Sequence, residues 1–147
     1  MLTLPSIAMK PISTTERITV DTNIVLYARN DAEPAKKEVA LNIIRQYPTL
    51  STQCFTEVIN VCRRKWKYDK NKQVSVADFL LNNSQLLPTD EKIIRLAHQL
   101  ITRYDFQYFD SLIVAAAWYG HCTILYTEDM HHDLLVEDQV RIVNPFR

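Results

Sequence analysis

The stretch Ile18-Thr19-Val20-Asp21-Thr22-Asn23 places an acidic residue directly after a short, β-branched run. Such a run favours an extended strand, and in open α/β domains the functional groups gather just beyond the carboxyl ends of the strands. Asp21 is therefore expected at that edge of a sheet. A second run, Thr123-Ile124-Leu125-Tyr126, is soon followed by Asp129 and repeats the arrangement. We expect the two acids to share a pocket.

The rest of the chain alternates helix-like and strand-like segments. Apolar periodicity and helix-ending Pro or Gly residues define the expected helices, which are residues 34–47, 53–67, 76–86, 91–103 and 110–119. The expected strands are residues 18–20, 50–52, 123–126 and 141–143. Alternating strands and helices predict a mainly parallel sheet with helices on both faces. The fold class is thus α/β, a three-layer α/β/α sandwich.

Length and composition indicate one folded domain. The chain has 147 residues, of which 47% are hydrophobic and 23% are charged, as in ordinary globular proteins. We expect the domain to span residues 18–147. Residues 1–17, which Pro5 and Pro11 interrupt, are expected to form a loosely attached extension without the apolar core of a signal peptide. No segment approaches the roughly 20 apolar residues that a membrane span needs.

Several functional classes are excluded by features that the sequence lacks. Its single glycine, Gly120, leaves no glycine-rich loop of the kinds that bind dinucleotides or nucleoside triphosphates. The net charge is zero, so a polyanion has to be met by a local basic patch. Cys54, Cys62 and Cys122 form neither a CxxC motif nor an even disulfide framework. We interpret them as reduced core residues, which favours a cytoplasmic protein.

One local patch has the charge that nucleic acid requires. Four basic residues lie close together at the end of an expected helix: Arg63, Arg64, Lys65 and Lys67. They fit a rim that contacts RNA phosphates, but such a cluster is also typical of a solvated helix end. Trp66, in their midst, fits either stacking on an unpaired base or packing in the core. Its four-residue spacing from Cys62 favours the core.

Two more acids, Glu57 and Asp110, accompany apolar sequence. Each acid also has an ordinary structural interpretation. Asp110 fits a helix N-cap, Asp129 fits a cap of the turn after its strand, and Glu57 fits an exposed acid in a first helical turn. The acids are more informative together than singly, because they recur at the places where an α/β domain forms its site.

Four converging acids indicate a cation site. Two carboxylates about 4 Å apart repel by about 4 kcal/mol at an effective dielectric constant of about 20, so convergence requires protons, cationic side chains or a metal. Oxygen ligands suit Mg²⁺, and Mn²⁺ is a plausible substitute. Such cations activate water for attack on a phosphodiester and stabilise the leaving oxygen. The pattern therefore predicts nuclease chemistry.

Two other chemistries fit less well. A transition-metal site at His131 and His132 lacks a second Cys/His pair at suitable spacing, so we interpret both as solvated loop residues. A phosphatase with an aspartyl nucleophile is disfavoured because the position two residues after Asp21 is Asn23 rather than a second acid.

In these motifs the chain resembles the PIN domains, and most closely the VapC-like toxins of bacterial toxin–antitoxin pairs. The resemblance spans residues 18–147 and departs from the usual family pattern at residues 131–135, where a glycine is common. It rests on these segments, in chain order: Ile18 to Asn23; Glu57-Val58, Asn60 and Arg64-Lys65; Tyr108-Phe109-Asp110-Ser111 with Leu112 to Ala117; Leu125 to Met130; and Ile142 to Phe146.

The resemblance implies a Mg²⁺- or Mn²⁺-dependent endoribonuclease that cleaves single-stranded or loop RNA. It assigns Asp21 and Asp110 as the principal metal ligands and Glu57 and Asp129 as the acids that complete the site. The implied supporting residues, which orient the carboxylates or contact phosphate, are Thr22, Asn23, Ser111 and Thr127.

The resemblance also implies partners. It suggests the toxin of a type II pair, held by a protein antitoxin and assembled as a homodimer. A second functional class stays open at this point. The chain also fits a PIN-like module that binds RNA or a protein and has no nuclease activity. Such a module needs no metal and tolerates Asp21→Asn, whereas a nuclease does not.

Overall fold

The computed structural model describes residues 16–147, so residues 1–15 of the predicted extension lie outside the described part of the chain. The elements in chain order are β1 (Ile18–Val20), α2 (Thr22–Tyr27), α3 (Pro34–Ile44), β2 (Thr49–Ser51), α4 (Thr52–Arg64), α5 (Lys70–Asn83), β3 (Gln85–Leu87), α6 (Glu91–Tyr104), α7 (Tyr108–Tyr119), β4 (Ile124–Tyr126), β5 (Leu135–Val136) and β6 (Val140–Val143).

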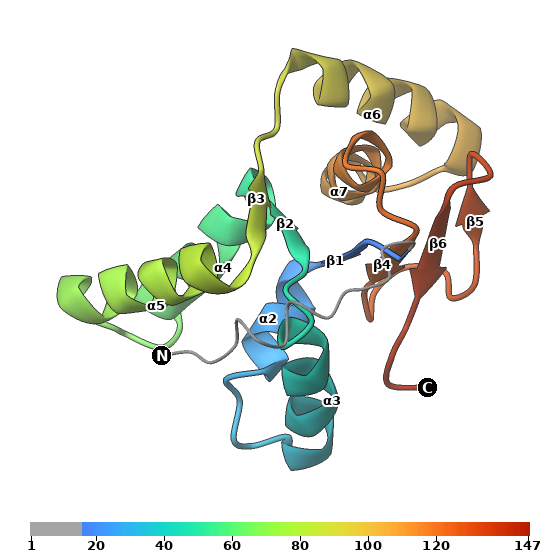
Figure 1. Ribbon diagram of the computed structural model, residues 1–147. Helices are drawn as coiled ribbons and strands as arrows, with labels where there is room; N and C mark the ends of the chain where they lie inside the picture. Colours follow the sequence, from blue (N-terminus) through green and yellow to red (C-terminus); the bar gives the residue numbers. More distant parts are fainter. Residues whose placement is uncertain (1–15) are drawn as a thin grey trace.

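The strands form one sheet in the order β3-β2-β1-β4-β6-β5. Every neighbouring pair is parallel except β5 with β6. Helices α2 and α3 lie on one side of the central strands, and α6 and α7 lie on the other (Figure 1). The predicted α/β/α sandwich around a mainly parallel sheet is therefore confirmed.

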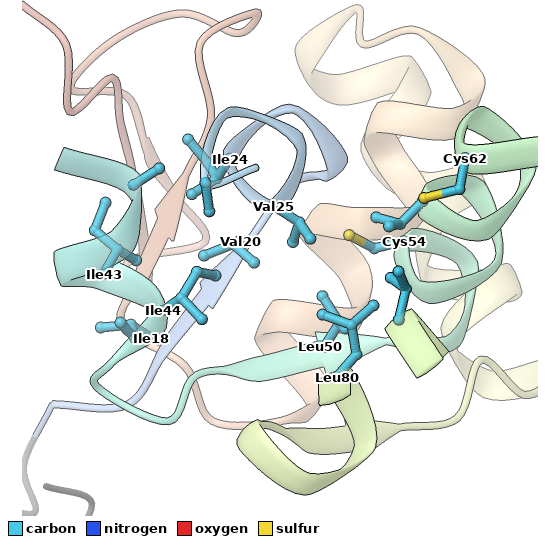
Figure 2. Packing of buried hydrophobic residues seen from close by; sticks show 14 residues of the cluster. Ile18, Val20, Ile24, Val25, Ile43, Ile44, Leu50, Cys54, Cys62 and Leu80 are labelled. Atoms are coloured by element: carbon cyan, nitrogen blue, oxygen red, sulfur yellow. The ribbon is translucent and has the colours of Figure 1, made fainter. Parts of the chain in front are cut away.

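Two hydrophobic clusters bind the helices to the sheet, because alternate strand residues face opposite layers. Ile18 and Val20 of β1 pack with Ile24 of α2 and Ile43 of α3 (Figure 2). Leu125 of β4 belongs to the second cluster, which contains the buried residues of α6 and α7. The central strands are thus covered on both faces, and their carboxyl ends stay free to carry a site.

The predicted helix at residues 76–86 is wrong at both ends. Helix α5 begins at Lys70, because the Asp69 side chain caps it by accepting a hydrogen bond from the backbone N–H of Lys72 (2.8 Å). The helix ends at Asn83, and residues 85–87 pair with β2 as strand β3. No cap was predicted for this helix from the sequence, so the role of Asp69 was missed.

Other element boundaries also differ from the prediction. The helices expected to end at residues 47 and 67 end at Ile44 and Arg64. Two short elements, α2 and β5, were not predicted, since six and two residues carry too little periodicity to be recognised. All three cysteines are buried and free, as predicted. In residues 16–147, no helix is long and apolar enough to cross a membrane.

Candidate active site

Asp21 lies where β1 ends and α2 begins, and it serves as the N-cap of α2. Its Oδ1 accepts a hydrogen bond from the backbone N–H of Thr22 (2.7 Å), and its Oδ2 accepts one from the hydroxyl of Thr127 (2.8 Å). Only 7% of Asp21 is exposed. Burial raises the pKa of Asp21 to about 6, and the charges of Asp110 and Asp129 add to this although both hydrogen bonds oppose it.

Helices α4 and α7 bring Glu57 and Asp110 to the same place. The Oε1 of Glu57 accepts a hydrogen bond from the hydroxyl of Thr22 (2.6 Å). Burial, together with the charges of Asp129 and Glu57, raises the pKa of Asp110. The ordinary interpretations of both acids are wrong: Gln107 is the N-cap of α7, and Glu57 lies beyond the first turn of α4.

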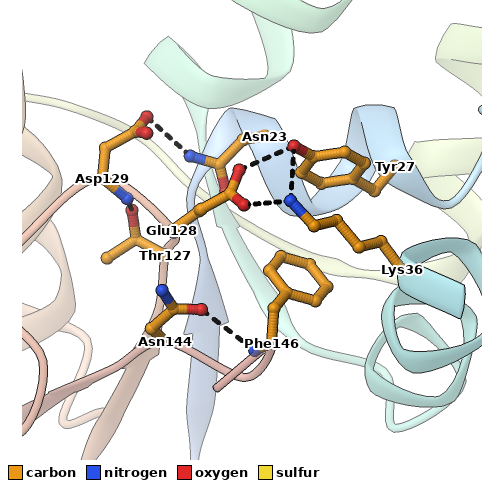
Figure 3. A network of polar contacts seen from close by, with 8 residues as sticks. All are labelled: Asn23, Tyr27, Lys36, Thr127, Glu128, Asp129, Asn144 and Phe146. Carbon is orange, nitrogen blue, oxygen red and sulfur yellow. Dashed lines mark hydrogen bonds and ion pairs between the residues drawn. The ribbon is translucent and has the colours of Figure 1, made fainter. Parts of the chain in front are cut away.

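Asp129 lies in the loop after β4 and is tied to α2. Its Oδ2 accepts a hydrogen bond from the side-chain amide of Asn23 (2.8 Å), and its backbone N–H donates to the Thr127 hydroxyl (3.2 Å) (Figure 3). Thr127 is fully buried and therefore connects two of the acids, because it donates to Asp21 and accepts from Asp129.

All four acids line one cavity of about 380 Å³ beyond the carboxyl ends of β1 and β4. The cavity is completed by polar and apolar residues from α2, α4 and α7: Thr22, Asn23, Leu26, Gln53, Asn60, Val61, Phe109 and Ile113. The sequence predicted neither Gln53 nor Phe109 here, because neither residue type signals a site by itself. Both come from helix starts that the fold places next to the acids.

The predicted supporting residues divide into two groups. Thr22, Asn23 and Thr127 each form a side-chain hydrogen bond with one of the four acids. Ser111 is fully buried, and its hydroxyl donates to the backbone carbonyl of Tyr108 (2.6 Å). Within residues 16–147, the Ser111 hydroxyl thus bonds within the first turn of α7 and not to a carboxylate, while the phosphate contact that was the alternative role stays a prediction.

The donor set suits a hard divalent cation, because the ionisable groups of the cavity are all carboxylates. In residues 16–147, however, no three His, Cys, Asp or Glu side chains are grouped closely enough to hold an ion. Burial and like charge, which raise the pKa of Asp21 and Asp110, oppose a closer approach of the ionised groups. The residues present therefore fit a divalent metal by their chemistry.

The basic patch adjoins this cavity. Its four members are exposed around the end of α4: Arg63, Arg64, Lys65 and Lys67. Arg64 and Lys65 line a hollow together with Asn60 and Val61, and these last two residues also line the acid cavity. Arg63 donates a hydrogen bond to the Asn60 side chain (3.0 Å). The cationic rim and the acids are thus parts of one continuous surface.

An ion pair next to the acids was not predicted. Lys36 of α3 pairs with Glu128, and the Tyr27 hydroxyl donates to the Glu128 Oε1 (2.7 Å) (Figure 3). The bonds from Lys36 and Tyr27 hold the pKa of Glu128 below its usual range. Glu128 therefore has its own counter-charge, unlike its neighbour Asp129. The pair was missed because its partners lie 92 positions apart in sequence.

Thr127→Val should lower the free energy of unfolding by about 1–3 kcal/mol, because a buried Asp21 oxygen and the N–H of Asp129 each lose a hydrogen-bond partner. Urea unfolding at neutral pH measures the change. Thr102→Val is the matched control, since that hydroxyl is exposed and bonds only within α6. Equal stability of the two variants would exclude the connecting role of Thr127.

The fold and the site define a PIN domain. A family model for the PIN domain matches residues 18–135, so the chain belongs to the PIN domain family. No curated protein matches the sequence. The assignment thus rests on the family model and on the residues described above.

Several solved structures share this fold. A toxin–antitoxin complex from Klebsiella pneumoniae has a TM-score of 0.65 at 18% identity and covers 87% of this chain and 97% of that chain. The Mycobacterium tuberculosis sarcin–ricin loop cleaving toxin VapC20 has a TM-score of 0.60 at 17% identity, covering 74% and 86%. The DNA-bound VapBC2 of Rickettsia felis has a TM-score of 0.62 at 16% identity, covering 86% and 98%.

Proposed function

We propose that this protein is an endoribonuclease that depends on a divalent cation. The observation that carries the proposal is the convergence of four acids from four separate parts of the chain on one cavity: Asp21, Glu57, Asp110 and Asp129. PIN domains are generally nucleases, and membership of that family supports the same activity. Helix capping accounts for Asp21 alone among the four acids, so it does not explain why all four line one cavity.

In this proposal Asp21 and Asp110 are the principal ligands of Mg²⁺ or Mn²⁺, and Glu57 and Asp129 complete the site. The cation supplies activation of water and neutralises charge at the leaving oxygen of the phosphodiester. The protein orients the carboxylates that would hold the cation. Thr127 fixes one oxygen of Asp21, which leaves the carboxylate with a defined direction before any ligand binds.

Single-stranded or loop RNA is the proposed substrate. Arg64 and Lys65 lie next to the acid cavity and provide contacts for phosphates on one side of the site. The structural neighbour VapC20 is described as a sarcin–ricin loop cleaving toxin, which supports a looped target. By structural similarity, we propose a looped RNA target for the present protein as well.

We also propose that the protein is a cytoplasmic toxin of a type II pair. Its structural neighbours include a toxin–antitoxin complex and DNA-bound VapBC assemblies, which supports a protein antitoxin as its partner. A homodimer is part of the same proposal. Growth that is unaffected by expression of the intact protein would contradict the toxin assignment while leaving the nuclease assignment untouched.

Mn²⁺ should stabilise the protein against unfolding. A ligand that binds only the folded state, present at about 100 times its Kd, raises the free energy of unfolding by about 2.7 kcal/mol. Thermal unfolding with and without Mn²⁺ measures the effect, and Mg²⁺ should act similarly. Asp110→Asn should lose most of the stabilisation, whereas Asp78→Asn, an exposed acid on α5, should keep it.

Cleavage of a labelled single-stranded RNA tests the activity itself. Protein purified free of any partner should cut the RNA in Mg²⁺ or Mn²⁺ and leave it intact in EDTA. Cutting that persists in EDTA would contradict the proposed chemistry. Folded protein that binds RNA without cutting it under either metal would favour the binding module.

A further inference from the structure

One face of helix α4 forms a wall along the acid cavity and beyond it. The residues of this face recur at helical spacing and line the acid cavity or the hollows next to it: Gln53, Glu57, Asn60, Val61, Arg64 and Lys65. From Gln53 to Lys65 the helix rises by roughly 18 Å at about 1.5 Å per residue. Glu57 lies within this length, so the wall extends past the acids toward the basic end of the helix.

Phe109 lies at one end of this wall, beside the acids. Its backbone carbonyl accepts a hydrogen bond from the Gln53 side chain (3.4 Å), and its ring lines the acid cavity. Phe109 is 63% exposed, the largest fraction among the large hydrophobic residues of the described chain. A ring this exposed at the rim of the acid cavity leaves part of its surface free to stack on another aromatic ring.

Trp66 lies at the other end of the wall, in a second hollow of about 280 Å³. This hollow shares Asn23, Leu26 and Val61 with the acid cavity, so the two are continuous. Lys65 lies beside Trp66 and forms no ion pair with another residue of the range 16–147. The sequence favoured Trp66 as a core residue, and the structure packs it, partly buried, against the first hydrophobic cluster. The same residue also lines this hollow, so part of its surface is open to a ligand.

We propose that an unpaired RNA strand lies along the α4 wall, with one base stacked on Phe109 and another on Trp66. The scissile phosphate then lies between them at the acids. Aromatic rings bind bases of any sequence by stacking, and duplex RNA offers no free base faces for this contact. Free cations at the Trp66 end fit the phosphates of the same strand. This inference rests on the proposed ribonuclease function and adds its substrate-positioning residues.

Binding of a short, fluorescein-labelled single-stranded RNA of mixed sequence tests the Phe109 contact. In the Asp110→Asn background with Mg²⁺ present, Phe109→Ala should weaken binding by roughly 5- to 100-fold, the loss expected for one stacked base. Phe109→Trp should retain binding. Phe79 is also an exposed ring but lies on α5, so Phe79→Ala should have no effect on RNA binding. Because Phe109 is exposed, its truncation leaves the core intact.

Tryptophan fluorescence tests the other end. Trp118→Phe leaves Trp66 as the sole tryptophan of the chain, and the same RNA should quench its emission, whereas a duplex of that sequence should not. Trp66→Tyr should bind RNA nearly as well as the parent, and Trp66→Leu should bind more weakly.

In the active protein, Phe109→Ala should raise KM for the RNA and leave kcat nearly unchanged. This result would separate a positioning role of Phe109 from a general loss of structure.

The outcomes separate this inference from the function on which it rests. Metal-dependent cutting with unchanged RNA binding by Phe109→Ala would overturn the stacking inference and leave the nuclease standing. If Phe109→Ala loses RNA binding but the parent protein never cuts RNA, the nuclease assignment would be overturned and the binding of RNA along the α4 wall would stand. Equal binding of duplex and single-stranded RNA would also overturn the inference, because the binding would then depend on another contact. An effect of Phe109→Ala on self-association alone would overturn it too, because another copy of the chain would then use Phe109.

Discussion

Asp21→Asn should stabilise the metal-free protein by up to about 3 kcal/mol at neutral pH and abolish RNA cleavage. The pKa of Asp21 rises from 3.8 to about 6 in the folded protein, chiefly through burial, and each pKa unit corresponds to about 1.36 kcal/mol. The folded protein therefore binds this proton more tightly than the unfolded chain does. Ionised Asp21 costs stability at neutral pH, and the neutral amide removes that cost.

The amide replaces the hydrogen bonds of the site in part. The Thr22 N–H can still donate to the Asn oxygen, and the Asn NH₂ group can donate to the Thr127 hydroxyl oxygen, which already accepts from Asp129. The Thr127 hydroxyl hydrogen then loses its acceptor, which reduces the gain in stability below its upper limit. Cleavage should be lost because Asp21 is one of the two principal metal ligands in the proposed site. We expect a loss beyond the roughly 10- to 100-fold that removal of an outer-shell partner costs.

Urea unfolding in EDTA across a range of pH measures the stability effect. Because the folded pKa is raised, the contribution of Asp21 is fully present below the unfolded pKa of 3.8 and is lost as the pH rises through about 6. The wild-type protein should lose stability relative to Asp21→Asn across that window, and the difference should be constant above it. Asp78→Asn is the control. A difference that is independent of pH would show that the ionisation of Asp21 is not its source.

Asp110→Asn should abolish cleavage with little change in stability. Asp110 lies in the first turn of α7 and is only partly buried, and no hydrogen bond between its carboxylate and another described residue depends on the charge. Its raised pKa, due to burial and to the charges of Asp129 and Glu57, means that the amide removes repulsion at neutral pH. Single-turnover cleavage in saturating Mg²⁺ measures the loss, with thermal unfolding alongside. A folded, active Asp110→Asn protein would remove Asp110 from the proposed metal ligands.

The central part of the fold could be predicted because local chemistry and tertiary structure agree there. The β-branched run of β1 and the run of β4 are buried strands, and each leads to an acid at the carboxyl edge. Strand β3 was missed because its first two residues are exposed, so its pairing with β2 rather than an apolar pattern defines it. Helix α2 was missed because it is short and depends on its cap at Asp21.

The acids of the site could be predicted, but most of their contacts could not. Asp21 and Asp129 follow strands and Asp110 lies in the first turn of the apolar helix α7, which leaves a signal in the sequence, whereas Glu57 lies inside α4. The contact between Thr127 and Asp21 joins residues 106 positions apart, and only the parallel pairing of β1 with β4 brings them together. The exposure of a side chain cannot be predicted from the sequence either. Phe109 resembles any apolar residue at a helix start, and only the fold shows that its side chain is exposed.

The parallel pairing of β1 with β4 also determines when the site can exist during synthesis of the chain. Asp21 leaves the ribosome 106 residues before Thr127 does, and Asp129 follows Thr127. Pairing between such distant segments is slow and requires most of the domain to be present. A nascent or truncated chain that lacks β4 cannot assemble the four acids. The proposed nuclease site can therefore form only after β4 and the loop that carries Asp129 have been synthesised.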